Sequence, residues 1–126
     1  MNLNSILIGS EDPARLKEYY TKLFGKPVWE DPAYSGWQLG TGFLSIGPHD
    51  QVKGKNESPG RILWNLETPD VKGEFDRLRE AGAIVVQEPY VPGPSGGDIE
   101  MWIATFADPD DNYFQLMSPM PEQPTA

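Results

Sequence analysis

The side chains best suited to acid–base or metal chemistry are few and scattered along this chain. The sequence holds one histidine, His49, and no cysteine. An imidazole can transfer protons near neutral pH, but it needs a partner to orient it, and none is evident beside His49. We therefore predict that His49 is a loop residue, because it follows Gly47-Pro48. The sequence identifies no set of catalytic residues.

Two further segments have compositions that occur in ligand-binding loops. Residues 108–112 (DPDDN) are rich in oxygen donors, but the other ligands of a twelve-residue calcium loop are missing. Residues 93–97 (GPSGG) are glycine-rich, but neither a helix nor a lysine follows at phosphate-loop spacing. We interpret the first segment as a tight turn and the second as a lip over a binding cleft.

Composition narrows the range of partners. The 126 residues include 19 acidic and 10 basic side chains, for a formal net charge of −9. Such a charge repels nucleic acid and anionic lipid surfaces, so we expect neither as a partner. The sequence shows no signal peptide and no membrane-spanning stretch, and together with the absence of cysteine this predicts a cytoplasmic protein.

The first half of the chain contains the signals of one strand, one helix and three more strands. Residues 3–9 alternate, with Ile6 and Ile8 on one face and Ser5 and Leu7 on the other. An amphipathic helix follows, which begins after a capping aspartate and ends at a glycine. Short apolar runs between turn formers then predict strands around residues 28–29, 37–39 and 43–46.

The second half repeats this order. Residues 61–67 read as a strand, a helix spans the next apolar periodicity, and residues 84–88, 100–106 and 113–118 supply three strands. The helix-start residues Asp12 and Asp70 lie 58 positions apart, and the helix-stop residues Gly25 and Gly82 lie 57 apart. An offset that holds at both ends of an element indicates an internal repeat.

We therefore predict an α+β fold of two tandem βαβββ modules within a single domain. Module one spans residues 2–50, a polar connector spans 51–60, module two spans 61–118, and a flexible tail spans 119–126. One face of each module's sheet packs on its helix, and the other face stays bare unless the two modules pair. Pairing predicts a curved mixed sheet around a cleft, with the helices on the outer face.

The repeat resembles the vicinal oxygen chelate superfamily, which includes glyoxalase I, bleomycin-resistance proteins and extradiol dioxygenases. The resemblance covers residues 2–118 and rests on the order and spacing of residues 19–25, 70–82 and 106–112. It implies a cleft that binds a small molecule and often a homodimer. In metal-dependent members the first and last strands of each module supply four ligands to a divalent ion.

At those four positions this sequence has side chains that bind metals poorly. Counting along the modules places Ser5 and Ser45 in the first half, and Leu63 and Gln115 in the second. Only Gln115 could coordinate an ion, whereas a stable catalytic site needs about three imidazole or carboxylate ligands. We therefore predict no metal and no other cofactor.

Strand alternation also predicts which side chains line the cleft. Trp64 and Phe114 fall on the core parity, whereas Trp37, Phe43 and Trp102 belong to strands whose register the sequence leaves open between core and cleft. The candidate ligand-binding residues are Ser5, Leu7, Trp37, Phe43, Ser45, Leu63, Asn65, Glu67, Trp102, Tyr113 and Gln115.

The function most consistent with these observations is metal-independent binding of a small molecule. Aromatic walls and an acidic surface favour an aromatic or cationic compound, which the protein would sequester. The alternative is a lyase, isomerase or dioxygenase of the same superfamily with an unrecognised metal or acid–base site. In that case Glu67 is the best cleft carboxylate.

Overall fold

The computed structural model describes residues 1–93 and 100–119, and each half of the chain has the predicted βαβββ order. The predicted lip at residues 93–97 and the tail at 119–126 lie almost wholly outside the described residues. The elements of module one are β1 (Ser5–Ser10), α1 (Pro13–Phe24), β2 (Trp29–Glu30), β3 (Ser35–Leu39) and β4 (Gly42–Pro48). After a 3-10 turn (Pro59–Arg61), those of module two are β5 (Leu63–Glu67), α2 (Val71–Glu80), β6 (Ile84–Tyr90), β7 (Ile103–Ala107) and β8 (Tyr113–Met117).

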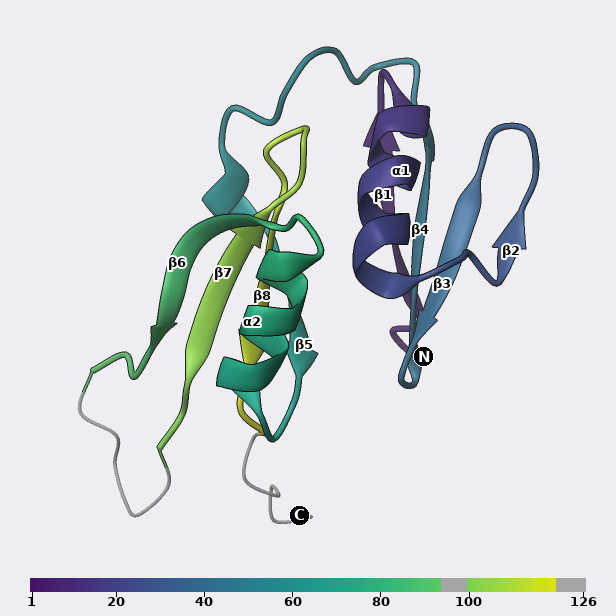
Figure 1. Ribbon diagram of the computed structural model, residues 1–126. Coiled ribbons are helices and arrows are strands. Elements are labelled where there is room, and N and C mark those ends of the chain that lie inside the picture. The colour runs from purple at the N-terminus through teal and green to yellow at the C-terminus, as the bar shows by residue number, and fades with distance from the viewer. Residues whose placement is uncertain (94–99, 120–126) are drawn as a thin grey trace.

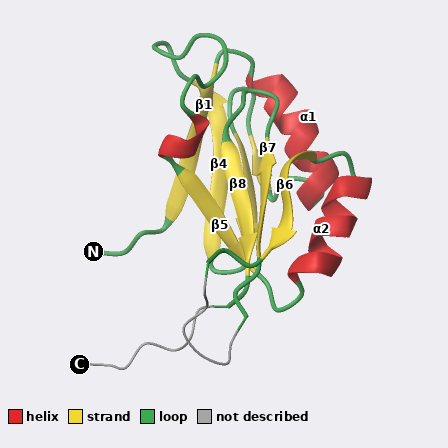
Figure 2. Cartoon of the chain, turned by 90° about the vertical axis from the view of Figure 1, so that its left-hand side faces the viewer, coloured by secondary structure: helices red, strands yellow, loops and turns green. Residues whose placement is uncertain are grey.

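Each module forms its own four-stranded mixed sheet. The strand order is β1-β4-β3-β2 in the first sheet and β5-β8-β7-β6 in the second. In both sheets the first strand pairs in parallel with the last, and the remaining pairs are antiparallel. Figure 1 shows the two modules side by side, and Figure 2 shows both helices on the same side of the strands. The α+β fold of two tandem modules is thus confirmed.

The two helices begin as their sequences predict. The Asp12 side chain accepts a hydrogen bond from the Arg15 amide (3.4 Å), and the Asp70 side chain accepts one from the Gly73 amide (3.0 Å). These contacts satisfy amides that have no partner within a first helical turn. Because both helices start at equivalent residues, they present equivalent positions to the sheets.

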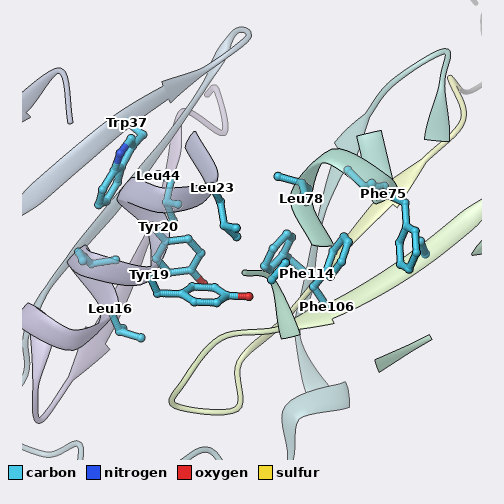
Figure 3. Close-up of a cluster of buried hydrophobic side chains, with 14 of the residues drawn as sticks. Leu16, Tyr19, Tyr20, Leu23, Trp37, Leu44, Phe75, Leu78, Phe106 and Phe114 are labelled. Carbon is cyan, nitrogen blue, oxygen red and sulfur yellow. The ribbon is translucent and has the colours of Figure 1, made fainter. Parts of the chain in front are cut away.

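The apolar core fills the side of the sheets on which the helices lie. Tyr20, Phe106 and Phe114 are completely buried, and Tyr20 of α1 points across toward Phe114 of module two (Figure 3). The ring centroids of Tyr20 and Phe114 lie 6.2 Å apart, and those of Trp64 and Phe114 stack at 4.7 Å. The core positions predicted for Trp64 and Phe114 are confirmed, and the modules share one core.

A polar contact ties α1 to the turn between β7 and β8. Buried Asp108 accepts hydrogen bonds from the Tyr20 hydroxyl (2.7 Å) and from the amides of Asp110 (2.8 Å) and Asn112 (3.0 Å). Asp110 in turn accepts from the Ser10 hydroxyl (2.5 Å) and pairs with Arg15. The tight turn predicted for residues 108–112 is confirmed, and it also joins the two modules.

Tyr19 of α1 makes a second contact of the same kind, and it predicts a loss of stability at alkaline pH. Its hydroxyl donates to the Ala107 carbonyl (2.7 Å) and accepts from the Ile84 amide (3.0 Å). Burial raises the pKa of Tyr19 from 10.0 to about 12. An acid whose pKa is raised by folding stabilises the folded state below pH 10, and this contribution is lost as the pH rises through 12.

We therefore expect the free energy of unfolding of the wild-type protein to fall between pH 10 and 12. In the Tyr19→Phe variant this fall should be smaller but not absent, because burial also raises the pKa of Tyr20 and that hydroxyl contributes in the same direction. Urea titrations of both proteins at several alkaline pH values measure the difference. Parallel curves for the two proteins would show that Tyr19 does not titrate as the structure indicates.

Candidate ligand-binding site

The face of the sheets opposite the helices carries most of the predicted cleft residues. Strand pairing places Leu7 beside Ser45 and Asn65 beside Gln115, each on the face away from the core. The Phe43 ring lies over Gly36 on this face, where a Cβ atom would clash with it. The predicted residues that share this parity are Ser5, Leu7, Phe43, Ser45, Leu63, Asn65, Glu67, Tyr113 and Gln115.

Two of the cleft candidates whose register the sequence left open between core and cleft lie on the helix side of the sheets, so the cleft alternative is wrong for both. Trp37 is 2% exposed, and its indole Nε1 donates to the Gly25 carbonyl at the end of α1 (2.8 Å). Trp102 precedes β7, and the ammonium group of Lys72 on α2 lies 3.8 Å from the centroid of its ring. Both tryptophans therefore pack on the helix side.

A cavity of about 1070 Å³ lies between the facing edges of the two sheets. Residues 3–6 line it from β1 and the segment before it, and residues 62–68 line it from β5 and its flanks. The other walls come from Phe24, Leu116 of β8, the turn between β3 and β4 with the adjoining strand ends, and three residues of α2. Five of the predicted cleft residues line it: Ser5, Phe43, Leu63, Asn65 and Glu67.

The internal repeat explains why the cavity lies on this side of the molecule. At the contact between α1 and module two, Tyr19 and Tyr20 fill the space beside the turn that follows β7. Fifty-eight positions later the equivalent residues of α2 are Arg77 and Leu78, and both line the cavity. An arginine that reaches outward and a leucine fill less space than two tyrosine rings, so a cavity remains.

The turns opposite the two helices differ in length, and the shorter turn lies opposite α2. Five residues, 108–112, join β7 to β8 and reach α1 through Asp108 and Asp110. Only two residues, Gly40 and Thr41, join β3 to β4. The shorter turn does not fill the space beside α2, and it forms one end of the cavity.

The cavity has an apolar interior and an acidic rim. Trp64, Leu66 and Phe24 line the interior together with other leucines, and all three pack against the core. At the rim, Glu74 accepts two hydrogen bonds from Arg77, at 2.9 and 2.5 Å, which neutralises that pair of charges. Glu67 is exposed and has no salt-bridge partner within residues 1–93 and 100–119.

A family model described as the glyoxalase-like domain matches residues 5–117. The chain belongs to this family. The match supports its place in the vicinal oxygen chelate superfamily, which the sequence resemblance predicted. A comparison with curated proteins finds no sequence that matches this chain.

Solved structures share the fold of this glyoxalase-like domain at low sequence identity. A glyoxalase-related enzyme from Fulvimarina pelagi is 18% identical, covers 94% of this chain and 88% of its own, and has a TM-score of 0.71. A glyoxalase/bleomycin resistance protein/dioxygenase family enzyme from Burkholderia phytofirmans PsJN is 18% identical, and the alignment covers 95% of this chain and 100% of that enzyme, with a TM-score of 0.68. TioX from Micromonospora sp. ML1 is 15% identical, and the alignment covers 95% of this chain and 100% of TioX, with a TM-score of 0.71.

The residues at the family's metal positions do not fit a divalent ion in this glyoxalase-like domain. Ser5 and Leu63 occupy equivalent places in the two sheets, as do Ser45 and Gln115. The Ser45 hydroxyl donates to the Ile6 carbonyl (3.3 Å), and the Gln115 amide donates to the Thr105 hydroxyl (3.2 Å). Within the described residues, no three His, Asp or Glu side chains gather as metal ligands.

The remaining side chains singled out from the sequence lie away from this site. His49 is an exposed loop residue just after β4, as predicted, and it accepts a hydrogen bond from the Gln51 amide (3.2 Å).

Of the helices in the described parts of the glyoxalase-like domain, none is long and apolar enough to cross a membrane.

Several residues that line the cavity were not predicted from the sequence as site residues. Trp64 was assigned to the core, and Phe24, Glu74, Arg77 and Leu78 were not considered. The signal that could have found them is the repeat itself. At the positions of Tyr19 and Tyr20, the second helix of this glyoxalase-like domain has an arginine and a leucine, which predicts uneven filling between the modules.

Proposed function

We propose that this glyoxalase-like domain binds a small aromatic or cationic molecule without a metal, in the cavity between β1 and β5. The observation that supports the proposal best is the size and lining of that cavity. Ligand sites in proteins have volumes of about 300–1,000 Å³ and apolar walls with a few polar groups. The present cavity has about 1070 Å³ and combines Trp64 and Phe24 with Asn65 and Glu67.

The charge around the cavity favours a cation over an anion. The chain has a formal net charge of −9, and the Glu67 carboxylate lies at the rim. The Arg77 guanidinium is engaged by Glu74 and, more weakly, by the Leu23 carbonyl at 3.5 Å. A cation in the cavity would therefore meet a carboxylate, and its flat surface could lie against aromatic rings.

We expect proflavine, a flat tricyclic cation, to bind to the protein with 1:1 stoichiometry. The Glu67→Gln variant should bind it about two- to fivefold more weakly at low salt, which corresponds to one exposed charge pair. Glu88→Gln is the matched control, because it removes the same charge from β6, outside the cavity. Isothermal titration calorimetry of the three proteins measures the affinities.

Equal weakening by both substitutions would reduce the effect to net charge alone and would argue against a site beside Glu67. No saturable binding of proflavine or of other basic aromatic compounds would contradict the proposed function. Stoichiometric zinc, nickel or iron in the purified protein, measured by elemental analysis, would overturn its metal-independent part. The homodimer implied by the family resemblance stays a prediction, which sedimentation analysis can test.

A further inference from the structure

We propose that the natural ligand is a short peptide or peptide-like chain, which binds as an added strand along the open edge of β5. This inference rests on the proposed function, because it names the chemical class of ligand for the same cavity. It is argued from the backbone N–H and C=O groups that face the cavity, whereas the proposed function is argued from the aromatic and acidic side chains that line it.

Both strands that face the cavity are the outer strands of their sheets. β1 is the first strand in the order β1-β4-β3-β2, and β5 is the first in the order β5-β8-β7-β6. The two strands belong to separate sheets and do not pair with each other. An outer strand presents a row of backbone N–H and C=O groups that can pair with another chain.

The lining shows that β5 meets the cavity with its edge and not with one face. A strand that presents a face contributes every second side chain, because side chains alternate. Here all seven consecutive residues from 62 to 68 line the cavity. Residues of both parities border one space here, as expected when the edge of the strand faces that space.

Hydrogen bonding identifies which backbone groups point into the cavity. The Thr68 amide donates to the Met117 carbonyl of β8 (2.9 Å). Because backbone groups of successive residues in a strand point to opposite sides, those of Leu66 and Trp64 also face β8. The N–H and C=O groups of Leu63, Asn65 and Glu67 therefore face away from β8, toward the cavity.

These groups match an extended peptide backbone. A chain laid along β5 could pair with the amides and carbonyls of three alternate residues, as in recognition by strand addition. Each net hydrogen bond contributes about 0.5–1.5 kcal/mol, so several of them give measurable affinity. A purely aromatic ligand without amide groups would leave this row unpaired.

The two sides of the β5 edge specify the side chains of the peptide. Trp64 and Leu66 project to the helix side, where Phe24 and Leu78 also line the cavity, and Asn65 and Glu67 project to the opposite face. Because side chains of an added strand alternate in the same way, its apolar residues should flank a basic residue. The cavity volume of about 1070 Å³ limits the occupant to a few residues.

The experiment compares two substitutions of Asn65 in binding to the peptide acetyl-Leu-Lys-Leu-amide. Asn65→Pro removes the amide that points into the cavity, and it leaves the hydrogen bonds to β8 intact because proline is tolerated on the open side of an edge strand. Asn65→Ala removes the side chain and keeps the amide. Asn65→Ala therefore measures the share of the side chain alone, and we expect Asn65→Pro to bind the peptide at least about tenfold more weakly than Asn65→Ala.

A second measurement does not depend on whether Asn65→Pro folds. Amide hydrogen exchange of the wild-type protein with saturating peptide should slow at Leu63, Asn65 and Glu67. A peptide N-methylated at each amide should bind at least about tenfold more weakly, because it has lost its donors. Unchanged exchange at these three amides would overturn strand addition.

The outcomes separate this inference from the proposed function. If Asn65→Pro and Asn65→Ala both still bind the peptide and proflavine, strand addition is overturned and the proposed function stands. If neither peptide nor proflavine binds to the wild-type protein, both are overturned. Loss of a wild-type dimer in Asn65→Pro, without any peptide binding, would assign the β5 edge to a second copy of the chain and contradict the inference.

Discussion

Replacement of Asp108 by alanine is expected to lower the free energy of unfolding by about 3–4 kcal/mol, because it leaves several buried donors without an acceptor. Asp108 is completely buried and accepts from the Tyr20 hydroxyl and the amides of Asp110 and Asn112. Burial raises the pKa of Asp108, but four donors surround its two oxygens and compensate the desolvated carboxyl. The substitution removes that compensation at the contact between the modules.

Tyr20→Phe should have a smaller effect, of about 1.5 kcal/mol, because Asp108 keeps its other hydrogen bonds. Asp76→Ala is the matched control, because Asp76 is exposed on α2 and, among residues 1–93 and 100–119, pairs with nearby Arg79. Its effect should stay within about 0.5 kcal/mol. Urea unfolding followed by tryptophan fluorescence measures all three variants.

Similar stabilities for Asp108→Ala and Asp76→Ala would show that the turn at residues 108–112 does not hold the modules together. If Asp108→Ala does not fold at all, Tyr20→Phe still tests the contact. A change in the slope of unfolding free energy against urea concentration would indicate that the modules unfold separately.

The repeat made most of the fold predictable from the sequence. Capping aspartates at Asp12 and Asp70 and glycines at Gly25 and Gly82 act locally, through backbone hydrogen bonds and dihedral preferences. Such signals do not depend on distant parts of the chain. The parities of β1, β5 and β8 could be counted from these fixed points, and Trp64 and Phe114 were therefore assigned correctly.

The orientation of Trp37 depends on contacts that the sequence does not display. The register of β3 against β4 pairs Trp37 with Leu44, and the ring of Phe43 covers Gly36 on the opposite face. Both faces of this short strand meet aromatic or apolar groups, so its hydropathy pattern does not distinguish them. The register of the strand at Trp102 was likewise open, and Trp102 shares the parity of Ala104 and Phe106, which are completely buried on the helix side.

The position of the cavity could not be predicted from either module alone. It depends on how the modules pack, and that packing is held by side chains of α1 that reach β7 and the following turn. Taken separately, α1 and α2 look equivalent, because both have a capping aspartate and a buried apolar stripe. The difference appears only when Tyr19 and Tyr20 are compared with the residues 58 positions later, Arg77 and Leu78.

This difference leads to a prediction with a large effect on binding. In Leu78→Tyr, α2 acquires the residue that α1 has at the equivalent position, Tyr20. Leu78 is 1% exposed and borders the cavity, so the larger ring should extend into that space. We expect the free energy of unfolding to fall by about 1–3 kcal/mol, the usual cost of enlarging a buried side chain. The affinity for proflavine should fall at least about 100-fold, because the ring occupies the space of the ligand.

Leu78→Met is the matched control, because it changes the shape of the side chain at nearly constant volume. It should bind proflavine within about threefold of the wild-type protein, as measured by calorimetry. Wild-type affinity in Leu78→Tyr would place the ligand elsewhere, on the exposed face of the sheets beside Tyr113 and Gln115. Loss of binding in both variants would instead show that Leu78 contacts the ligand directly. The pair of variants therefore distinguishes a ligand between β1 and β5 from one held on the open face alone, and it tests whether the uneven filling of the two modules creates the site.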